Sequence, residues 1–330
     1  MKWALSLLFI AFSLCAKGTV YIVEIGGIQT DKYFYDYAFY RDEVSKPYVM
    51  LREAIEAAGY DVRFTKDCFN LRNVAAIISF SDASREIMRN LVRYPKERCF
   101  LFIFEPPVVL PYLYEKKLNY SFGKIFTMFD DLATQPSYEK LYFPMPRLSV
   151  IEDVLDFDEK KFCMLINGNK DFQHPKALYE ERRKAIAFFT EKGDFDLYGP
   201  DWNGYEAWRG PVAAKWDLLK EYKFCICYEN MRDQEGYITE KIFDCMVGGC
   251  VPVYWGASNI ADYVPKEAFI DRRGFGSDEE LFAHLKAIGR AEYESYLAAA
   301  QNFFSSPEAQ RFSSENFVQT VLDEIRRVAP

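Results

Sequence analysis

Short apolar runs that alternate with helical patterns constrain the fold of this chain most. In the first half such runs occur at residues 20–25, 62–64, 75–80, 99–104, 124–129 and 141–143, and residues 47–58 carry apolar side chains at helical spacing. Strands that alternate with helices predict a parallel sheet covered on both faces. We therefore expect an α/β fold in which the strands are buried.

The same alternation begins again after a proline-containing, acidic stretch between Pro144 and Lys161, which we take as a boundary. Strands are expected at residues 162–166, 195–198, 224–228 and 251–255, with helices at 178–189, 213–222 and 239–247. Three helical stretches follow, and the last carries Phe317, Val321, Leu322 and Ile325 on one face. Two α/β halves, residues 18–150 and 151–330, predict a ligand cleft at the carboxyl ends of the strands.

Composition excludes several classes of function. The chain of 330 residues has 41 Lys and Arg against 49 Asp and Glu, a net charge of −8, and no basic run. Nucleic-acid binding needs a positive surface, so we expect no nucleic-acid partner. Only two histidines occur, His174 and His284, which argues against a histidine-rich metal site. The eight scattered cysteines are expected to be buried free thiols.

The N-terminus carries the one targeting signal. Met1 and Lys2 precede an apolar run over residues 3–16, and Lys17 follows it. This pattern predicts that residues 1–17 are an export signal or a short membrane anchor. The alternative is a buried segment that leads into the first strand.

The region 222–270 carries the most specific chemistry. A buried strand ends at Tyr228, so Glu229 and Asn230 follow at its carboxyl edge. Thr239 is placed to cap a helix, with Glu240 and Lys241 in the first turn. A cation at this end opposes the helix dipole, which makes sense if an anion such as a diphosphate binds to the free N–H groups. The alternative is a solvated pair of charges.

This region strongly resembles the donor-binding signature of α-1,3-fucosyltransferases, glycosyltransferase family ten. The resemblance rests on Tyr-Glu-Asn at 228–230, Tyr-x-Thr-Glu-Lys at 237–241, Gly-Gly-x-Val-Pro-Val-Tyr-Trp-Gly at 248–256 and Asp-Tyr-Val-Pro-x-x-x-Phe-Ile at 262–270. It extends more weakly to Phe104-Glu105-Pro106-Pro107, Ile166-Asn167, Arg182 and Tyr198-Gly199.

The resemblance implies two facing Rossmann-like domains in the GT-B arrangement. Residues 18–150 would bind the acceptor, and residues 151–330 would bind GDP-fucose. The implied reaction transfers L-fucose, with inversion, to a GlcNAc or glucose unit of a glycan. Such a single displacement needs a base for the acceptor hydroxyl and cations for the departing diphosphate. Glu105 is our candidate base, because an apolar strand precedes it and should raise its pKa. The alternative is a solvated strand-end carboxylate.

The donor side is assigned mainly by the resemblance. Arg182 and Lys241 are the expected diphosphate clamp, although helical phase alone leaves Arg183 as a rival of Arg182. Glu240 matches the acidic residue that binds the fucose hydroxyls. The other positions assigned to donor binding are Asn167, Tyr198, Glu229, Asn230, Tyr237 and Thr239.

No cofactor or catalytic metal is expected, because Arg and Lys would stabilise the leaving group. Asp-x-Asp at 156–158 and at 194–196 matches a metal motif of a different glycosyltransferase fold, and we interpret both as structural. Gly26-Gly27 is expected to form a tight turn at the cleft rim.

The alternatives are the same scaffold with another GDP-sugar or acceptor, and a non-catalytic, two-lobed sugar-binding protein. For a fucosyltransferase, the N-terminal apolar segment favours a membrane-associated location: Golgi-type in a eukaryote, or the cytoplasmic face of the membrane in a bacterium. The alternative location is the cytoplasm.

Overall fold

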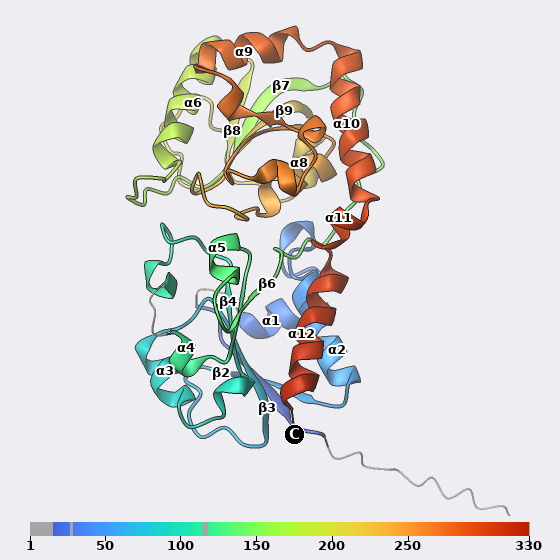
Figure 1. Cartoon of the computed structure of the whole chain (residues 1–330). Coiled ribbons are helices and arrows are strands. Elements are labelled where there is room, and N and C mark those ends of the chain that lie inside the picture. The colour runs from blue at the N-terminus through green and yellow to red at the C-terminus, as the bar shows by residue number, and fades with distance from the viewer. Residues whose placement is uncertain (1–15, 27–28, 115–117, 330) are drawn as a thin grey trace, which may run out of the picture.

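The chain folds into two lobes, each built on one parallel sheet (Figure 1). The computed structural model describes residues 16–26, 29–114 and 118–329. The first lobe has a six-stranded sheet in the order β2-β1-β3-β4-β5-β6, and the second lobe has a five-stranded sheet in the order β11-β10-β9-β7-β8. All strand pairs in both sheets are parallel, as the alternating sequence pattern predicts.

The first lobe contains the strands β1 Thr19–Val23, β2 Asp61–Thr65, β3 Val74–Phe80, β4 Cys99–Ile103, β5 Lys124–Thr127 and β6 Tyr138–Lys140. Its helices are α1 Thr30–Tyr35, α2 Lys46–Ala57, α3 Arg85–Leu91, α4 Leu118–Ser121 and α5 Asp130–Ala133, with 3-10 turns η1 Arg41–Glu43, η2 Lys96–Arg98 and η3 Pro111–Tyr114.

The second lobe contains the strands β7 Lys161–Ile166, β8 Phe195–Tyr198, β9 Tyr222–Tyr228, β10 Val251–Trp255 and β11 Ile270–Asp271. Its helices are α6 Tyr179–Lys192, α7 Lys215–Leu219, α8 Glu240–Val247, α9 Asp278–Ala287, α10 Arg290–Phe304 and α11 Pro307–Gln310, with 3-10 turns η4 Ile260–Asp262, η5 Lys266–Ala268 and η6 Arg272–Gly274. The last helix is α12, Ser314–Val328.

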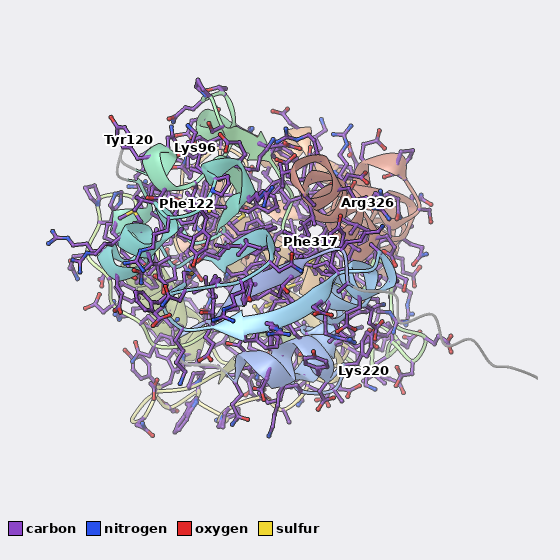
Figure 2. The ribbon with its side chains drawn as sticks, turned by 90° about the horizontal axis from the view of Figure 1, so that it is seen from below. Lys96, Tyr120, Phe122, Lys220, Phe317 and Arg326 are labelled. Atoms are coloured by element: carbon purple, nitrogen blue, oxygen red, sulfur yellow. The ribbon has the colours of Figure 1, made fainter. Side chains whose placement is uncertain are left out.

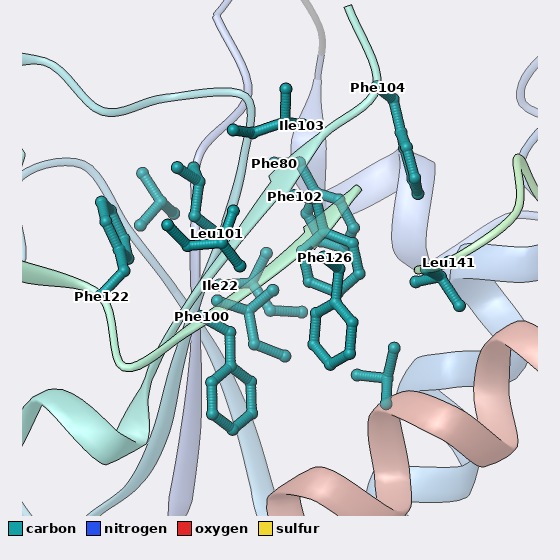
Figure 3. Close-up of a cluster of buried hydrophobic side chains, with 14 of the residues drawn as sticks. Ile22, Phe80, Phe100, Leu101, Phe102, Ile103, Phe104, Phe122, Phe126 and Leu141 are labelled. Carbon is teal, nitrogen blue, oxygen red and sulfur yellow. The ribbon is translucent and has the colours of Figure 1, made fainter. Parts of the chain in front are cut away.

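The core of the first lobe explains why its central strands are continuous apolar runs in the sequence. Every residue of β4 is buried, as expected for a central parallel strand covered on both faces. Phe80, Phe102 and Phe126 come from three adjacent strands, and their ring centroids lie 4.6 and 4.9 Å apart (Figure 3). This apolar stack supports the end of β4, from which Glu105 emerges.

The C-terminal helix differs from the predicted division of the chain. We placed residues 151–330 in one domain, but α12 runs back and packs against α2 of the first lobe (Figure 1). Phe317, Val321 and Ile325 are buried in the apolar cluster of that lobe, while Arg326 is exposed nearer the edge in Figure 2. The amphipathic pattern predicts an apolar face, but it does not say which sheet that face will cover.

The expected export signal or anchor falls almost wholly on residues 1–15, which lie outside the described residues, so membrane attachment stays a prediction. None of the helices within the described ranges has the length and apolar character needed to cross a bilayer. The seven cysteines from Cys68 onward are buried free thiols, as predicted.

Candidate active site

A cleft between the lobes brings most of the predicted site residues together. Its cavity has a volume of about 390 Å³, and strand ends of both sheets line it: β4 from the first lobe, and β7, β8 and β9 from the second. Seven of the predicted residues line it, namely Glu105, Asn167, Asn230, Tyr237, Thr239, Glu240 and Lys241. Arg182, Tyr198 and Glu229 lie outside this lining.

Glu105 is the acidic group that the first lobe contributes to this cleft. It lies two residues after the end of β4, and the Tyr114 hydroxyl donates a 2.9 Å hydrogen bond to its backbone carbonyl. Burial raises the pKa of Glu105, while the nearby Lys241 ammonium opposes the shift. The structure therefore places this carboxyl group in the environment that the sequence predicted.

Glu105 also lines a second cavity, of about 630 Å³, at the carboxyl ends of β1, β3 and β4. The wall of this cavity is rich in aromatic side chains: Tyr33, Tyr40, Tyr48, Phe80, Phe104, Tyr112 and Phe143. Tyr40 and Tyr112 remain more than a third exposed. Gly26 also lies in this wall, so half of the predicted Gly26-Gly27 turn borders a cavity, and Gly27 is outside the described residues. We missed this aromatic surface, because its members are spread over about 110 residues of sequence.

The start of α8 confirms the predicted cap position but not its hydrogen bond. Thr239 is the N-cap residue, with an extended backbone, and its side chain does not cap the helix. Its hydroxyl group instead lies 2.9 Å from both carboxylate oxygens of Glu229, and its backbone N–H donates to the same carboxylate at 3.0 Å. The first N–H groups of α8 are thus left without a side-chain cap at the edge of the cleft.

Glu229 therefore supports the cleft rather than lining it, which corrects its assignment as a direct donor contact. It is fully buried, and its Oε2 lies 3.0 Å from Nζ of Lys241. Burial would lower the pKa of Lys241, but Glu229 and Glu240 outweigh it and raise that pKa. Lys241 is consequently charged and held in place at the first turn of α8.

A second lysine, Lys215, completes the charge network. Its Nζ lies 2.8 Å from Asp244 and 4.0 Å from Glu240. Burial acts to raise the pKa of Glu240, but Lys241 and Lys215 bring it down to about 2. Glu240 is therefore ionised in the cleft. Our sequence analysis missed Lys215 and Asp244, because neither lies in a motif that we used.

Arg182 lies behind Asn230 and is 1% exposed. Its Nη2 donates to the Tyr228 carbonyl at 2.7 Å and to Oδ1 of Asn230 at 3.0 Å. Within the described part of the chain, its Nε and Nη1 have no hydrogen-bond partner. Burial lowers the pKa of this guanidinium group. A buried cation with unused donors is costly unless a ligand completes its hydrogen bonds.

Asn167 and Tyr198 mark two adjoining strand ends, but only Asn167 faces the cleft. The Tyr198 hydroxyl is 2.9 Å from that of Tyr222, and Tyr198 is outside the lining of the cleft, so its role in donor binding stays a prediction. The following residue, Gly199, has φ +116°, and a Cβ there would overlap the backbone carbonyl of Asn167. The Tyr-Gly pair is thus needed for the close approach of the two loops, with Gly199 itself in the cleft wall.

The loop before Tyr237 is fixed by contacts with the first lobe. Tyr237 stacks on Phe129 with centroids 5.6 Å apart, and the two residues belong to one apolar cluster. Beside it, Asp130 accepts hydrogen bonds from Tyr263 at 2.6 Å and from Asn259 at 2.9 Å. Asn259 in turn accepts from the backbone N–H of Gly236 at 3.0 Å. These bonds connect the first lobe to the loop that leads into α8.

The two Asp-x-Asp segments are engaged in ion pairs. Asp156 and Asp158 both bind Arg290 at 2.6 Å. Asp194 pairs with Lys286 at 3.1 Å, and Asp196 pairs with Arg209 at 2.6 Å. None of the four aspartates lies in the lining of the cleft.

Two facing parallel-sheet lobes with a cleft at their strand ends are the arrangement expected of the GT-B fold. Residues 160–321 match the family model described as glycosyltransferase family 10 (fucosyltransferase) C-terminal domain. The second lobe therefore carries a C-terminal domain of the family 10 fucosyltransferases.

Curated relatives match parts of the chain. The chain is 45% identical over 83 residues to an alpha-(1,4)-fucosyltransferase of Arabidopsis thaliana and 37% identical over 78 residues to the alpha-(1,3)-fucosyltransferase FucT of Helicobacter pylori. It is 30% identical over 150 residues to 4-galactosyl-N-acetylglucosaminide 3-alpha-L-fucosyltransferase 9 of Mus musculus. These matches cover 24%, 23% and 44% of this chain, and they span only 20%, 16% and 38% of the respective relatives.

Solved structures match the fold over nearly the whole chain. A crystal structure of an alpha1,3-fucosyltransferase gives a TM-score of 0.58 at 14% identity and covers 94% of this chain and 90% of its own. The structure of Anabaena HepE with UDP and glucose gives 0.57 at 12% identity and covers 94% and 100%. At such identities these likenesses establish the shared GT-B fold.

Proposed function

We propose that the protein transfers L-fucose from GDP-fucose to a hydroxyl group of a GlcNAc or glucose unit in a glycan, with inversion at the anomeric carbon. The observation that carries this proposal is the position of Glu105, which lines both the interlobe cleft and the aromatic cavity beside it. A carboxylate between two cavities can take a proton from a substrate in one while a second substrate reacts in the other. The family match and the names of the relatives support the donor.

The reaction requires one bond to form while another breaks. The acceptor oxygen attacks the anomeric carbon, its proton passes to Glu105, and the bond from that carbon to the diphosphate oxygen breaks, so that GDP leaves. The raised pKa of Glu105 suits this role, because a base works best when its pKa approaches the working pH. Inversion follows from a single displacement on the face opposite the leaving group.

On the donor side the uncapped start of α8, Lys241 and Arg182 are proposed to bind the diphosphate. The N–H groups of a helix start attract anions, and the unused donors of Arg182 add charge-assisted hydrogen bonds. The ionised Glu240 is proposed to accept hydrogen bonds from the fucose hydroxyls. These groups would stabilise the leaving group without a metal ion.

The aromatic cavity of the first lobe is proposed to hold the acceptor sugar. Aromatic rings such as Tyr40 and Tyr112 offer flat apolar surfaces on which the C–H face of a sugar ring packs. The relatives are named for α-1,3 and for α-1,4 transfer, and we propose the 1,3 linkage.

The test is the release of GDP from GDP-fucose by the purified full-length chain, with and without N-acetyllactosamine and related disaccharides. We expect acceptor-dependent release and a fucosylated product whose linkage is read by NMR. Glu105→Gln should lower turnover by roughly 100-fold or more while GDP binding is retained. The control is Glu97→Gln, an exposed carboxylate in η2.

Each result has a clear meaning. Binding of GDP without release from GDP-fucose, but with release from another GDP-sugar, would replace the donor and keep the scaffold. Turnover by Glu105→Gln near that of the unmodified protein would place the base elsewhere. If GDP did not bind at all, the transferase proposal would be wrong and a non-catalytic sugar-binding role would take its place.

A further inference from the structure

A short segment of the first lobe, Tyr40–Val44, reaches the second lobe and is called the strap below. Its Asp42 carboxylate accepts hydrogen bonds from the backbone N–H of Lys215 at 2.9 and 3.0 Å and from that of Trp216 at 3.3 Å. These are the first two residues of α7, and the methyl side chain of its own N-cap residue, Ala214, cannot accept a hydrogen bond. The cap of α7 is thus supplied by the other lobe.

The strap is held in a strained backbone conformation. Asp42 has φ +56° and Glu43 has φ +54°, and neither residue is glycine. Two successive left-handed residues persist only where surrounding contacts fix them. Here the contacts are the cap on α7 and the hydrogen bond from Arg41 to the Val212 carbonyl, both with the second lobe. Such strain often marks a segment with a role in function.

The strap forms part of the wall of both cavities. Tyr40 and Val44 line the aromatic cavity, while Arg41 lines the interlobe cleft. The helix that the strap caps also carries Lys215, which lies 4.0 Å from Glu240. The Asp42 side chain is 3% exposed, so water does not replace its contacts with α7.

We infer that Asp42 is a positioning residue for fucosyl transfer: by capping α7 across the lobes it seats the strap, which keeps Tyr40 and Val44 in the acceptor wall. This inference rests on the proposed function. GDP itself should be less affected, because its proposed contacts, Arg182 and Lys241, belong to α6 and α8 rather than to the strap or to α7. The expected signature is therefore a change in acceptor KM without a matching change in GDP affinity.

The experiment compares Asp42→Ala with Glu43→Ala in the full-length protein. Glu43 has the same charge and the same left-handed backbone, but its side chain is 54% exposed, and its ion-pair partner among the described residues is Lys46 at 3.7 Å. We expect Asp42→Ala to raise the acceptor KM about tenfold, as expected for the loss of a helix cap. The dissociation constant of GDP, measured without acceptor, should stay within about twofold. Glu43→Ala should match the unmodified protein in both.

A third variant separates positioning from simple support of α7. Ala214→Ser, added to Asp42→Ala, gives α7 a local cap in an extended residue suited to it. We expect this double variant to regain thermal stability while its acceptor KM stays raised. The same double variant serves if Asp42→Ala alone does not fold.

Two results would overturn the inference. One is an unchanged acceptor KM in Asp42→Ala. The other is recovery of that KM by Ala214→Ser, which would mean that Asp42 only stabilises α7. Failure of the proposed function is distinguishable, because the unmodified protein would then show no acceptor-dependent release of GDP at all.

Discussion

Replacement of Arg182 by methionine should separate ligand binding from stability. Without ligand, methionine removes a buried cation whose Nε and Nη1 lack partners in the described chain. It also removes the hydrogen bonds to the Tyr228 carbonyl and to Asn230. Each polar group left unsatisfied costs about 1–3 kcal/mol, so the gain and the loss nearly offset each other. We expect the free energy of unfolding without ligand to change by less than about 2 kcal/mol.

The effect on GDP binding should be much larger. Loss of a buried, charge-assisted contact to a diphosphate costs about 3 kcal/mol of binding free energy, which raises the dissociation constant of GDP roughly 150-fold. At a GDP concentration about 100 times the dissociation constant of the unmodified protein, binding adds ~2.7 kcal/mol to its stability. At the same concentration it would add only ~0.3 kcal/mol to Arg182→Met.

The assay is thermal unfolding with and without GDP, together with calorimetric titration. Arg183→Met is the matched control, because Arg183 is the next residue of α6 and pairs with Asp171 and Glu180 instead. It should keep the full GDP-induced rise in Tm. A normal rise in Arg182→Met, or its loss in Arg183→Met, would refute the assignment of Arg182.

The remaining predictions concern the loop before α8, the ion pair between Lys241 and Glu229, and the dependence of activity on pH and on metal ions. Gly236→Ala should destabilise the protein by ~2–4 kcal/mol in urea unfolding, because φ is +75° and a Cβ would overlap the Met128 carbonyl. Lys241→Met should cost ~3–5 kcal/mol by leaving Glu229 buried and unpaired, and adding Glu229→Gln should restore part of that loss. Because Glu105 acts as its carboxylate and its pKa is raised, kcat/KM should fall as the pH decreases, with the acid limb above pH 4.5. EDTA should leave activity intact, and loss of activity that manganese restores would argue for a catalytic metal.

The sequence predicts the fold well where the pattern is local. Continuous apolar runs such as residues 99–104 become central strands, because both faces of a parallel sheet are covered. The destination of α12 could not be predicted in this way. Its apolar face fits any apolar surface, and the choice of α2 of the first lobe follows only from tertiary packing.

The candidate site shows the same contrast between local motifs and tertiary contacts. Glu105, Glu240 and Lys241 were found because each lies in a short motif of fixed spacing. Asp42 and Lys215 were missed, because their contact joins residues 173 positions apart and depends on how the lobes meet. A motif also cannot tell a residue that touches a ligand from one that supports it, and Glu229 shows this most clearly.

The distinction between touching a ligand and supporting the site also separates the two residues of the predicted diphosphate clamp, Arg182 and Lys241. Three carboxylates, Glu229, Glu240 and Asp244, and two lysines, Lys241 and Lys215, give the network around α8 a net charge of −1 when all are ionised. Such a network does not by itself attract an anion. Lys241 is already balanced by carboxylates, so its removal should act mainly on stability. Arg182 donates only to neutral acceptors and keeps unused donors, so its charge remains available to a diphosphate. The two residues of the clamp, to which the resemblance assigns one role, should therefore respond differently: the Lys241 variant loses stability first, and the Arg182 variant loses GDP binding first.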